Sequence, residues 1–405
     1  MTGSSFYSVE KDLDGRSGGT TQAETRIYNE RLVISLIRRN GQLSKVELTH
    51  LTGLSPQTIT TIVNRIADDG LLERLTPLRG RRGQPSVPFA LNAEGAYSFG
   101  LRIDRYSADI AMINFLGQIV AFERTTFAFP VPAEVMSFAR AGIARICRKQ
   151  KSDVVSRIAG LGIASPFHIW SWDEETDIPL DVRKAWRQID IRAELDREFS
   201  WPVYFFNDAM VAAGAELMFG SGVGRADFLY IYLGSVVGGG LVLDHHIFPG
   251  RGKLAAMLGD MVVPGGGDNG RPLLLKQAVS LKALAATLPK SASEKIWSSP
   301  DEWDDLGSPL TSWIDQVATS LGDAILSVVA LLDVDNVFID GAIPAEVRRN
   351  IARATRRRVA PALASRPEPF NILEGNYGHM APAIGGASIP LLVRYSNDKD
   401  LLFKE

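Results

Sequence analysis

One segment near the N-terminus carries polar side chains at positions suited to reading DNA. Ile59, Ile62, Val63 and Ile66 recur with helical spacing and predict a single apolar stripe. The opposite face presents short or polar side chains without an acid, namely Gln57, Thr58, Thr60, Thr61, Asn64 and Arg65. Amides, hydroxyls and a guanidinium recognise base edges in the major groove. The pattern therefore predicts a recognition helix.

The elements that position this helix follow from the neighbouring residues. A first helix is expected from Arg26 to Asn40, where an Asn-Gly pair ends it. Ser44 and Glu47 have the spacing of a capping box and predict a short second helix. Ser55 is suited to cap the recognition helix, with Pro56 in its first turn. Two helices joined by a short turn with glycine are typical of a helix-turn-helix.

A basic loop after the recognition helix extends this interpretation. Residues 70–75 predict a strand, 76–88 form a loop rich in Arg, Gly and Pro, and 89–91 resume the strand. The loop's candidate DNA contacts are Arg79, Arg81, Arg82 and Gln84. Arginine beside glycine suits a narrow minor groove, so the hairpin is expected to be the wing of a winged helix. The alternative is an ordinary three-helix subdomain followed by a basic linker.

Composition sets the class of protein. The chain has 405 residues, 45% apolar and 22% charged, with a net charge of −2, which predicts a globular protein of several domains. Residues 20–95 hold ten basic and seven acidic side chains, a local excess of positive charge. A single cysteine, Cys147, excludes intramolecular disulfides and fits a reducing cytoplasm. The longest apolar run noted, 325–332, is too short to span a membrane, and no secretory signal is recognised at the N-terminus.

From about residue 97 onward, strands alternate with helices. Expected strands are 98–103, 108–113, 118–127, 158–164, 201–206, 228–233, 241–243 and 337–339, and expected helices are 133–150, 209–219 and 310–332. Sets of strands followed by helices occur twice, which predicts two α/β lobes around a cleft. We expect a flexible tail at 1–22, the winged helix-turn-helix at 23–92 and the two-lobed domain at 93–405.

Several motifs together resemble the ROK family of repressors, open reading frames and sugar kinases. They read ELTHLTGLSPQTITTIV, RGRRGQPSVPFAL, GLGIASP, PVYFFNDAMVAAGAE and LGSVVGGGLVLDHHIFPG. The chain resembles the family's winged-helix transcriptional regulators over nearly all residues from about 23 onward. The resemblance implies an α/β fold of the actin/hexokinase-like class, in which two lobes are hinged over a sugar site.

The resemblance also implies residues that bind a ligand. Asn207 and Asp208 match the family's sugar-binding Asn-Asp pair, and Ser165 and Pro166 lie in the Gly-rich strand end that lines the site. A carboxylate accepts hydrogen bonds from sugar hydroxyls, and in kinase members the matching Asp is the general base. Asp208 could instead cap the helix expected from residue 209, and both roles can hold together.

The sequence departs from the family where zinc is bound. Family members carry Ala-Gly-Glu-Ile-Gly-His, whose Glu and His hold sugar and whose His ligates zinc; here Met257 and Asp260 replace them. The family's cysteine cluster is also missing, so a zinc site of that type is excluded. We assign Met257 and Asp260 to the candidate ligand site and expect no metal or other cofactor.

Nucleotide binding is also disfavoured. Kinases of this class need an Asp-x-Gly-Gly-Thr loop whose backbone amides cradle phosphates, but residues 103–108 contain no glycine. A second loop, 234–240, keeps Gly234 and the run 238–240, where tight turns and close backbone packing are the favoured interpretation. Phosphoryl transfer is therefore not expected.

These observations predict a cytoplasmic transcriptional regulator, in the repressor class, that is not an enzyme. Its expected partners are operator DNA, a small carbohydrate-like effector, and a second copy in a homodimer or dimer of dimers, without a membrane. One alternative is a sugar kinase with an appended DNA-binding domain. Another is a ligand-independent DNA-binding protein with a degenerate sensor. The sequence names neither the effector nor the operator.

Overall fold

A computed structural model describes residues 22–77, 87–166, 178–266, 271–303, 305–364 and 368–396. The chain forms two compact units, one of residues 1–95 with 392–405 and one of residues 96–391. We call them the N-terminal unit and the large unit. Arg79, Arg81, Arg82 and Gln84, four of the predicted DNA contacts, lie outside the described residues.

The N-terminal unit contains three helices and a small sheet. The helices are α1 (Gln22–Asn40), α2 (Lys45–Thr52) and α3 (Pro56–Asp68). Strands β1 (Gln42–Ser44), β2 (Leu72–Arg74) and β3 (Pro88–Leu91) pair in the order β1-β3-β2, followed by η1 (Ala93–Gly95). The antiparallel β2–β3 pair confirms the expected hairpin, whereas β1 was not anticipated. Helix α1 begins at Gln22, which the sequence assigned to the tail.

Local capping signals hold in the structure. The Ser44 hydroxyl accepts a hydrogen bond from the Glu47 amide at 3.3 Å, and the Glu47 carboxylate accepts one from the Ser44 amide at 2.8 Å. The Ser55 hydroxyl accepts from the Thr58 amide at 3.1 Å, so Ser55 caps α3 as expected. Gly53, with φ of 68°, ends α2. The apolar face of α3 is buried throughout.

The large unit is built on two five-stranded sheets with the same order of strands. The first sheet, β6-β5-β4-β7-β8, uses β4 (Tyr97–Ile103), β5 (Ser107–Asn114), β6 (Ile119–Thr126), β7 (Ile158–Ala164) and β8 (Val203–Phe206). The second, β11-β10-β9-β14-β15, uses β9 (Phe228–Leu233), β10 (Val237–Leu243), β11 (His246–Ile247), β14 (Asn336–Gly341) and β15 (Asn371–Glu374). In each sheet three consecutive antiparallel strands are followed by two parallel strands. The repeated pattern confirms two α/β lobes, which we call the first and second lobe.

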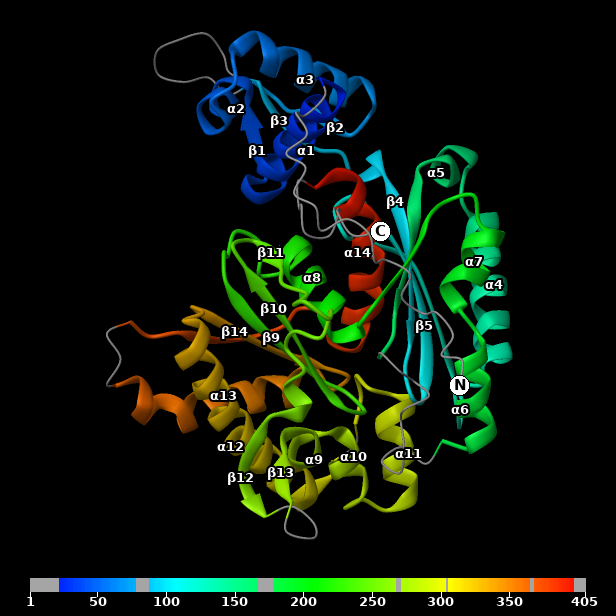
Figure 1. The fold of residues 1–405 in the computed structure, drawn as a ribbon, viewed down its shortest axis with the longest axis vertical. Helices are drawn as coiled ribbons and strands as arrows, with labels where there is room; N and C mark the ends of the chain where they lie inside the picture. The colour runs from blue at the N-terminus through cyan, green and yellow to red at the C-terminus, as the bar shows by residue number, and fades with distance from the viewer. Residues whose placement is uncertain are drawn as a thin grey trace. The chain divides into compact units, whose positions relative to one another are not determined.

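Two helices lie on the inner sides of the sheets. They are α14 (Ala381–Tyr395) and α8 (Asp208–Phe219). A β-carbon at Gly100 of β4 would collide with the Ala383 carbonyl, and one at Gly385 would meet the Val211 carbonyl, so glycine permits α14 to contact both β4 and α8. Figure 1 shows α14 between β4 and α8, with α4 (Pro132–Lys149), α6 (Leu180–Gln188) and α7 (Ile191–Glu198) on the outer side of the first sheet.

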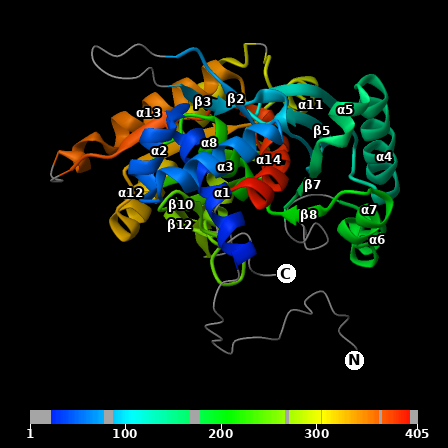
Figure 2. The ribbon, with the colours of Figure 1, turned by 90° about the horizontal axis from the view of Figure 1, so that it is seen from above.

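The outer helices of the second lobe are α12 (Gly307–Leu332) and α13 (Ala345–Leu363), which Figure 2 shows on the flank opposite α4, α6 and α7. By length and composition α12 is the one helix of the described residues that could cross a membrane. However, Trp313, Val317, Leu321 and Ile325 are buried at a spacing of four residues. A one-sided buried stripe is typical of a core helix, and we assign α12 to the core.

The remaining elements complete the large unit. They are α5 (Ser152–Ser156), η3 (Leu258–Asp260), β12 (Val262–Gly266), β13 (Pro272–Leu274), α9 (Leu275–Val279), α10 (Leu281–Ala285), α11 (Lys290–Ser298) and η5 (Gly378–Met380). The glycine run 238–240 lies within β10, so the expected loop is shorter than predicted. A β-carbon at Gly238 would lie 2.5 Å from the Ala209 methyl, which is why glycine lets β10 pack directly on α8.

Candidate DNA-reading helix and carbohydrate site

The predicted recognition face lies on the side of α3 away from the buried stripe. Gln57, Thr61 and Arg65 are exposed, and Thr58, Thr60 and Asn64 are partly exposed. Some of these side chains also hold the helix in place. Arg65 pairs with Glu30 of α1 at 3.1 Å, and the Asn64 side-chain oxygen accepts from the Lys45 ammonium of α2 at 3.0 Å. Base readout by Asn64 or Arg65 would therefore compete with these contacts.

Asn207 and Asp208 lie where the chain passes from β8 of the first lobe to α8 beside β10. The Asn207 side-chain oxygen accepts from the Met210 amide at 3.2 Å, so Asn207 is the N-cap of α8. Asp208 is the first helical residue, and its carboxylate accepts from the Ala209 amide at 2.9 Å. The expectation that Asp208 caps the helix is therefore wrong, because the helix starts one residue earlier. With Asn207 occupied as the cap, Asp208 is the stronger ligand candidate of the pair.

The charge of Asp208 is set by its surroundings. Burial, together with the nearby Asp104 carboxylate, raises the pKa of Asp208 to about 6, while the Arg102 guanidinium and the Ala209 amide act in the opposite direction. Asp208 nevertheless remains partly accessible to solvent. A carboxylate in this state accepts hydrogen bonds from a ligand's hydroxyl groups at neutral pH.

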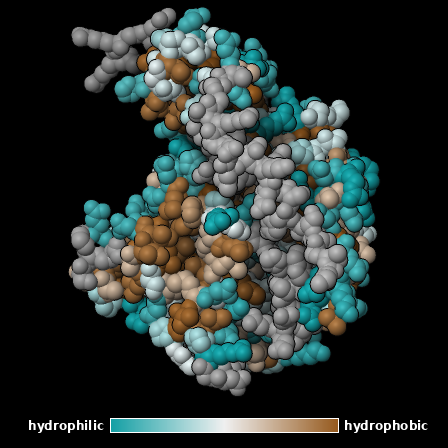
Figure 3. Space-filling view, in the orientation of Figure 1, coloured by the Kyte–Doolittle hydropathy of each residue, from teal (hydrophilic) through white to brown (hydrophobic). Residues whose placement is uncertain are grey.

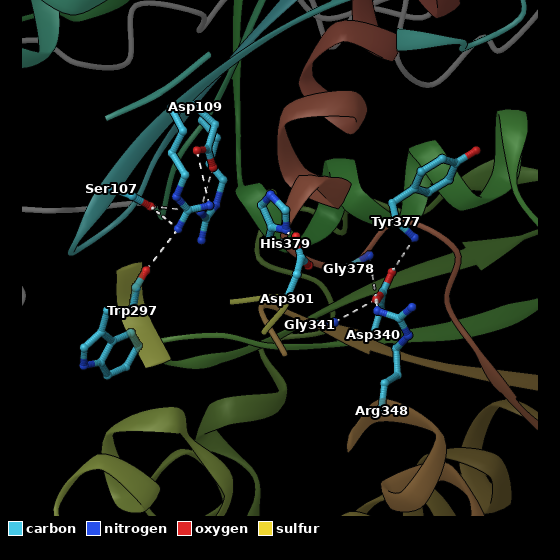
Figure 4. A network of polar contacts seen from close by, with 12 residues as sticks. Ser107, Asp109, Trp297, Asp301, Asp340, Gly341, Arg348, Tyr377, Gly378 and His379 are labelled. Carbon is cyan, nitrogen blue, oxygen red and sulfur yellow. Dashed lines mark hydrogen bonds and ion pairs between the residues drawn. The ribbon is translucent and has the colours of Figure 1, made fainter. Parts of the chain in front are cut away.

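Arg102, which sequence reasoning missed, organises the first-lobe side of the site. Its guanidinium is fully buried and contacts Asp104 at 2.5 Å and Asp109 at 3.0 Å. Arg124 contacts the second oxygen of Asp109 at 3.4 Å and donates to Ser107 at 3.2 Å. Figure 4 shows the Ser107 and Asp109 side of this cluster. Two cations thus neutralise two buried carboxylates of the first lobe.

The cluster also contacts the second lobe. The Ser235 hydroxyl, in the β9–β10 turn, donates to the free oxygen of Asp104 at 2.8 Å. Arg124 donates to the Trp297 carbonyl of α11 at 3.3 Å, and the Tyr106 ring stacks on Trp297 with centroids 4.3 Å apart. The turn 104–106 is therefore filled by side chains and joined to the facing loop. A loop that binds phosphate needs exposed backbone amides at this place instead.

The remaining predicted ligand residues separate into two groups. Ser165 is buried, and its amide donates to the Phe206 carbonyl at 3.1 Å, which places Ser165 and the adjoining Pro166 beside the Asn207 strand end. Met257 directly precedes η3 and Asp260 is its last residue. Asp260 pairs with Lys276 at 3.3 Å. The segment that leads into η3 reaches the strand end before Asn207, where the Lys253 ammonium lies 6.0 Å from the centroid of the Phe206 ring.

The η3 turn and helix α8 both pack on β10. A β-carbon at Gly238 would face Ala209 of α8, whereas one at Gly239 would lie 2.6 Å from the Leu258 side chain of η3. Because successive strand residues point to opposite faces, η3 and α8 lie on opposite faces of β10. Met257 is 46% exposed, and Figure 3 shows apolar surface over the part of the large unit that holds β10 and β11.

No metal centre is evident in the described part of the chain, where no three His, Cys, Asp or Glu side chains group together.

The missed residues Arg102, Asp104 and Asp109 did leave a signal in the sequence. They are charged residues inside an otherwise apolar hairpin, LRIDRYSADI, and buried charges occur mainly as pairs. Ser235 carried no such signal, since its partner is 131 residues away.

Comparisons with known proteins identify the two domains. A model of the ROK family matches residues 99–391, and a model of winged helix-turn-helix DNA-binding domains matches residues 28–73. The chain belongs to the ROK family. This confirms the family resemblance and, with the two lobes, the actin/hexokinase-like fold class.

Relatives in the ROK family include both regulators and kinases. The xylose repressor of Bacillus subtilis is 21% identical over 377 residues, which cover 91% of this chain and 96% of the repressor. A solved ROK family transcriptional regulator, described as a homologue of the Escherichia coli Mlc protein, has a TM-score of 0.64 at 19% identity, covering 94% of this chain and 98% of that one. A ROK glucokinase from Streptomyces griseus, solved with glucose and AMPPNP, has a TM-score of 0.57 at 18% identity and covers 73% of this chain and 99% of the kinase.

Proposed function

We propose that this protein is a transcriptional repressor that binds operator DNA and responds to a sugar or sugar-like effector. One observation carries the proposal: a winged helix-turn-helix precedes a ROK domain in a single chain, and 91% of the chain aligns with a xylose repressor. The polar face of α3 would read the operator, and the side chains beyond the described residues, Arg79 to Gln84, would contact the minor groove.

The sensing mechanism centres on Asp208. A sugar hydroxyl donates to its carboxylate at the junction of the lobes, next to the Asp104–Ser235 hydrogen bond that joins them. An effector that prefers one arrangement of the lobes shifts the population toward it. In a homodimer, that shift changes how two winged helices fit paired half-sites. Dimerisation and a cytoplasmic location are parts of this proposal.

The protein is proposed to act without enzymatic activity. Asp104 matches the Asp of the kinase loop, but it is held by Arg102 and Ser235, and no glycine follows it in residues 105–108 to expose backbone amides to a phosphate. Arg105 does not replace the missing glycines, because its guanidinium donates to the Ala128 carbonyl and lies against the Tyr106 and Phe129 rings. Residues 257 and 260 lack the family's Glu and His, which also argues against a zinc cofactor.

The same replacements favour one second candidate, a DNA-binding protein whose large unit is only a scaffold. A thermal-shift screen against sugars, polyols, amino sugars and sugar phosphates, with ATP included, separates the two. A stabilisation that rises with ligand concentration and disappears in Asp208→Ala supports the sensor. If no carbohydrate stabilises the protein, the scaffold is supported. ATP-dependent phosphorylation of a sugar would contradict both the sensor and the scaffold.

The DNA-binding half is tested with a site selected from random DNA by the purified protein. Thr61→Ala should weaken binding to that site by ~1–3 kcal/mol and change binding to random DNA far less. Arg82→Ala should weaken both and flatten the salt dependence. Equal losses on both DNAs for Thr61→Ala would mean that α3 does not read bases through this residue.

A further inference from the structure

The Tyr232 side chain on β9 is a buried donor that the mechanism above does not use. Tyr232 is almost fully buried, and within the described ranges its hydroxyl has no hydrogen-bond partner. Burial raises the pKa of its phenol, so the proton stays in place at neutral pH. Buried polar groups are normally hydrogen-bonded, so this hydroxyl is a candidate donor for a bound molecule.

Its two neighbouring strands explain the lack of a partner. Across β10, the residue opposite Tyr232 is Gly238, which has no side chain. Across β14, it is Asp340, but that carboxylate already accepts hydrogen bonds from Tyr230, Arg348 and the amides of Gly341, Tyr377 and Gly378, at 2.9–3.3 Å. Figure 4 shows Asp340 surrounded by its donors. The register of the sheet therefore gives the Tyr232 hydroxyl no acceptor on either neighbouring strand.

The hydroxyl belongs to the same region as Asp208. Opposite residues of an antiparallel pair point to the same face, and Gly238 faces Ala209, so Tyr232 lies on the face that carries the start of α8. The charged groups near enough to influence its phenol are Arg102, Asp104, Asp208 and Asp340. Arg102 has both terminal nitrogens on carboxylates, which leaves Asp208 as the group that shares a ligand with Tyr232.

We propose that the Tyr232 hydroxyl is a binding contact for the carbohydrate hydroxyl that Asp208 holds. This inference rests on the proposed sensor function and adds the class of ligand. A neutral hydroxyl donates a hydrogen bond to the Asp208 carboxylate and accepts a hydrogen bond from the Tyr232 hydroxyl at the same time. A phosphate or carboxylate group only accepts, and it would face the negative charges of Asp208 and Asp104. The site therefore selects neutral sugars over sugar phosphates.

The unliganded protein provides the first test. Tyr232→Phe removes the hydroxyl alone, and Tyr230→Phe is its matched control on the same strand, because Tyr230 donates to Asp340 at 2.9 Å. We expect the Tm of Tyr232→Phe to equal or exceed that of the wild type, and the Tm of Tyr230→Phe to fall by several degrees. A fall in Tyr232→Phe as large as that of the control would overturn the inference, since it would reveal a partner within the protein.

Calorimetric titration provides the second test, with D-xylose, D-glucose and glucose 6-phosphate as probes, followed by a wider panel of neutral sugars. We expect a neutral sugar to bind, Asp208→Asn to abolish binding, and Tyr232→Phe to weaken it about threefold to tenfold. Binding that Asp208→Asn abolishes and Tyr232→Phe leaves unchanged overturns this inference alone. Preference for glucose 6-phosphate overturns the proposed ligand class, and no binding by any neutral sugar overturns the sensor function as well.

Discussion

The two sheets of the large unit place Arg102 and Tyr232 at equivalent positions, one residue before the end of their first strand. Opposite Arg102 is Asp109, which neutralises it at 3.0 Å, whereas opposite Tyr232 is Gly238. The turns that follow also differ, because residues 104–106 all carry side chains whereas the turn 234–236 begins with glycine. Arg102 thus has buried counter-charges within its own lobe, whereas the Tyr232 hydroxyl has no hydrogen-bond partner among the described residues. Identical topology therefore does not imply an identical role.

The largest expected effect comes from removing the buried counter-charge of Arg102. Asp109→Ala would leave Arg102 and Arg124 short of a buried counter-charge, and we expect a loss of about 3–5 kcal/mol in the free energy of unfolding. Chemical denaturation measures it. Lys276→Ala is the control, because its partner Asp260 is exposed and such pairs contribute about 0–1 kcal/mol. Equal losses in the two variants would show that burial of the Asp109 cluster has no special weight.

In the second lobe, the packing of β10 on α8 depends on glycine. Gly238→Ala would place a methyl group 2.5 Å from that of Ala209, and we expect it to cost about 1–3 kcal/mol of stability through overpacking between β10 and α8. Gly266→Ala in β12 meets nothing within 4 Å and should change stability by less than about 0.5 kcal/mol. If Gly238→Ala were as mild as Gly266→Ala, the close approach of α8 would not require glycine.

Asp208 lies near Arg102 of the first lobe and near Tyr232 of the second. Its protonation makes effector binding depend on pH. Because its pKa is raised to about 6, protonation removes the acceptor below that pH, and affinity should fall about tenfold (~1.4 kcal/mol) from pH 7 to pH 5. Asp104→Asn removes a like charge, lowers the pKa of Asp208 and should keep binding intact to lower pH. Titrations with the sugar that gives the strongest thermal shift measure both effects. Affinity that stays constant from pH 5 to pH 7 would contradict the assignment of Asp208 as acceptor.

The smallest expected effect concerns the hydrogen bond between the two turns. Ser235→Ala removes the donor to Asp104, and we expect a loss of about 0.5–1.5 kcal/mol in stability. A double-mutant cycle with Asp104→Asn isolates the pair from its surroundings. Additive effects in that cycle would show that the two turns are not coupled through this contact.

Sequence reasoning succeeded where the determining interactions are local. The Ser44–Glu47 capping box, the Ser55 cap and the buried stripe of α3 all lie within one or two helical turns. It failed where the role of a residue depends on the exact start of a helix or on a partner far away in the sequence. The alternative role of Asp208 as a helix cap belongs to Asn207, and the Asp104–Ser235 hydrogen bond joins residues 131 positions apart. The motif match gives the order of residues along the chain but not the face of the sheet on which each one lies.

The sequence by itself determined the winged helix-turn-helix, the two α/β lobes and the ROK family, because helix caps, apolar periodicity and motif spacing are properties of short segments. The DNA-reading and ligand residues remain predictions from the same source. Only the tertiary structure decided that Asp104 is hydrogen-bonded to Ser235, 131 residues away, and that the Tyr232 hydroxyl finds no hydrogen-bond partner among the residues described. Both depend on which strands and turns face one another, and that is fixed by packing of the whole unit rather than by any local pattern.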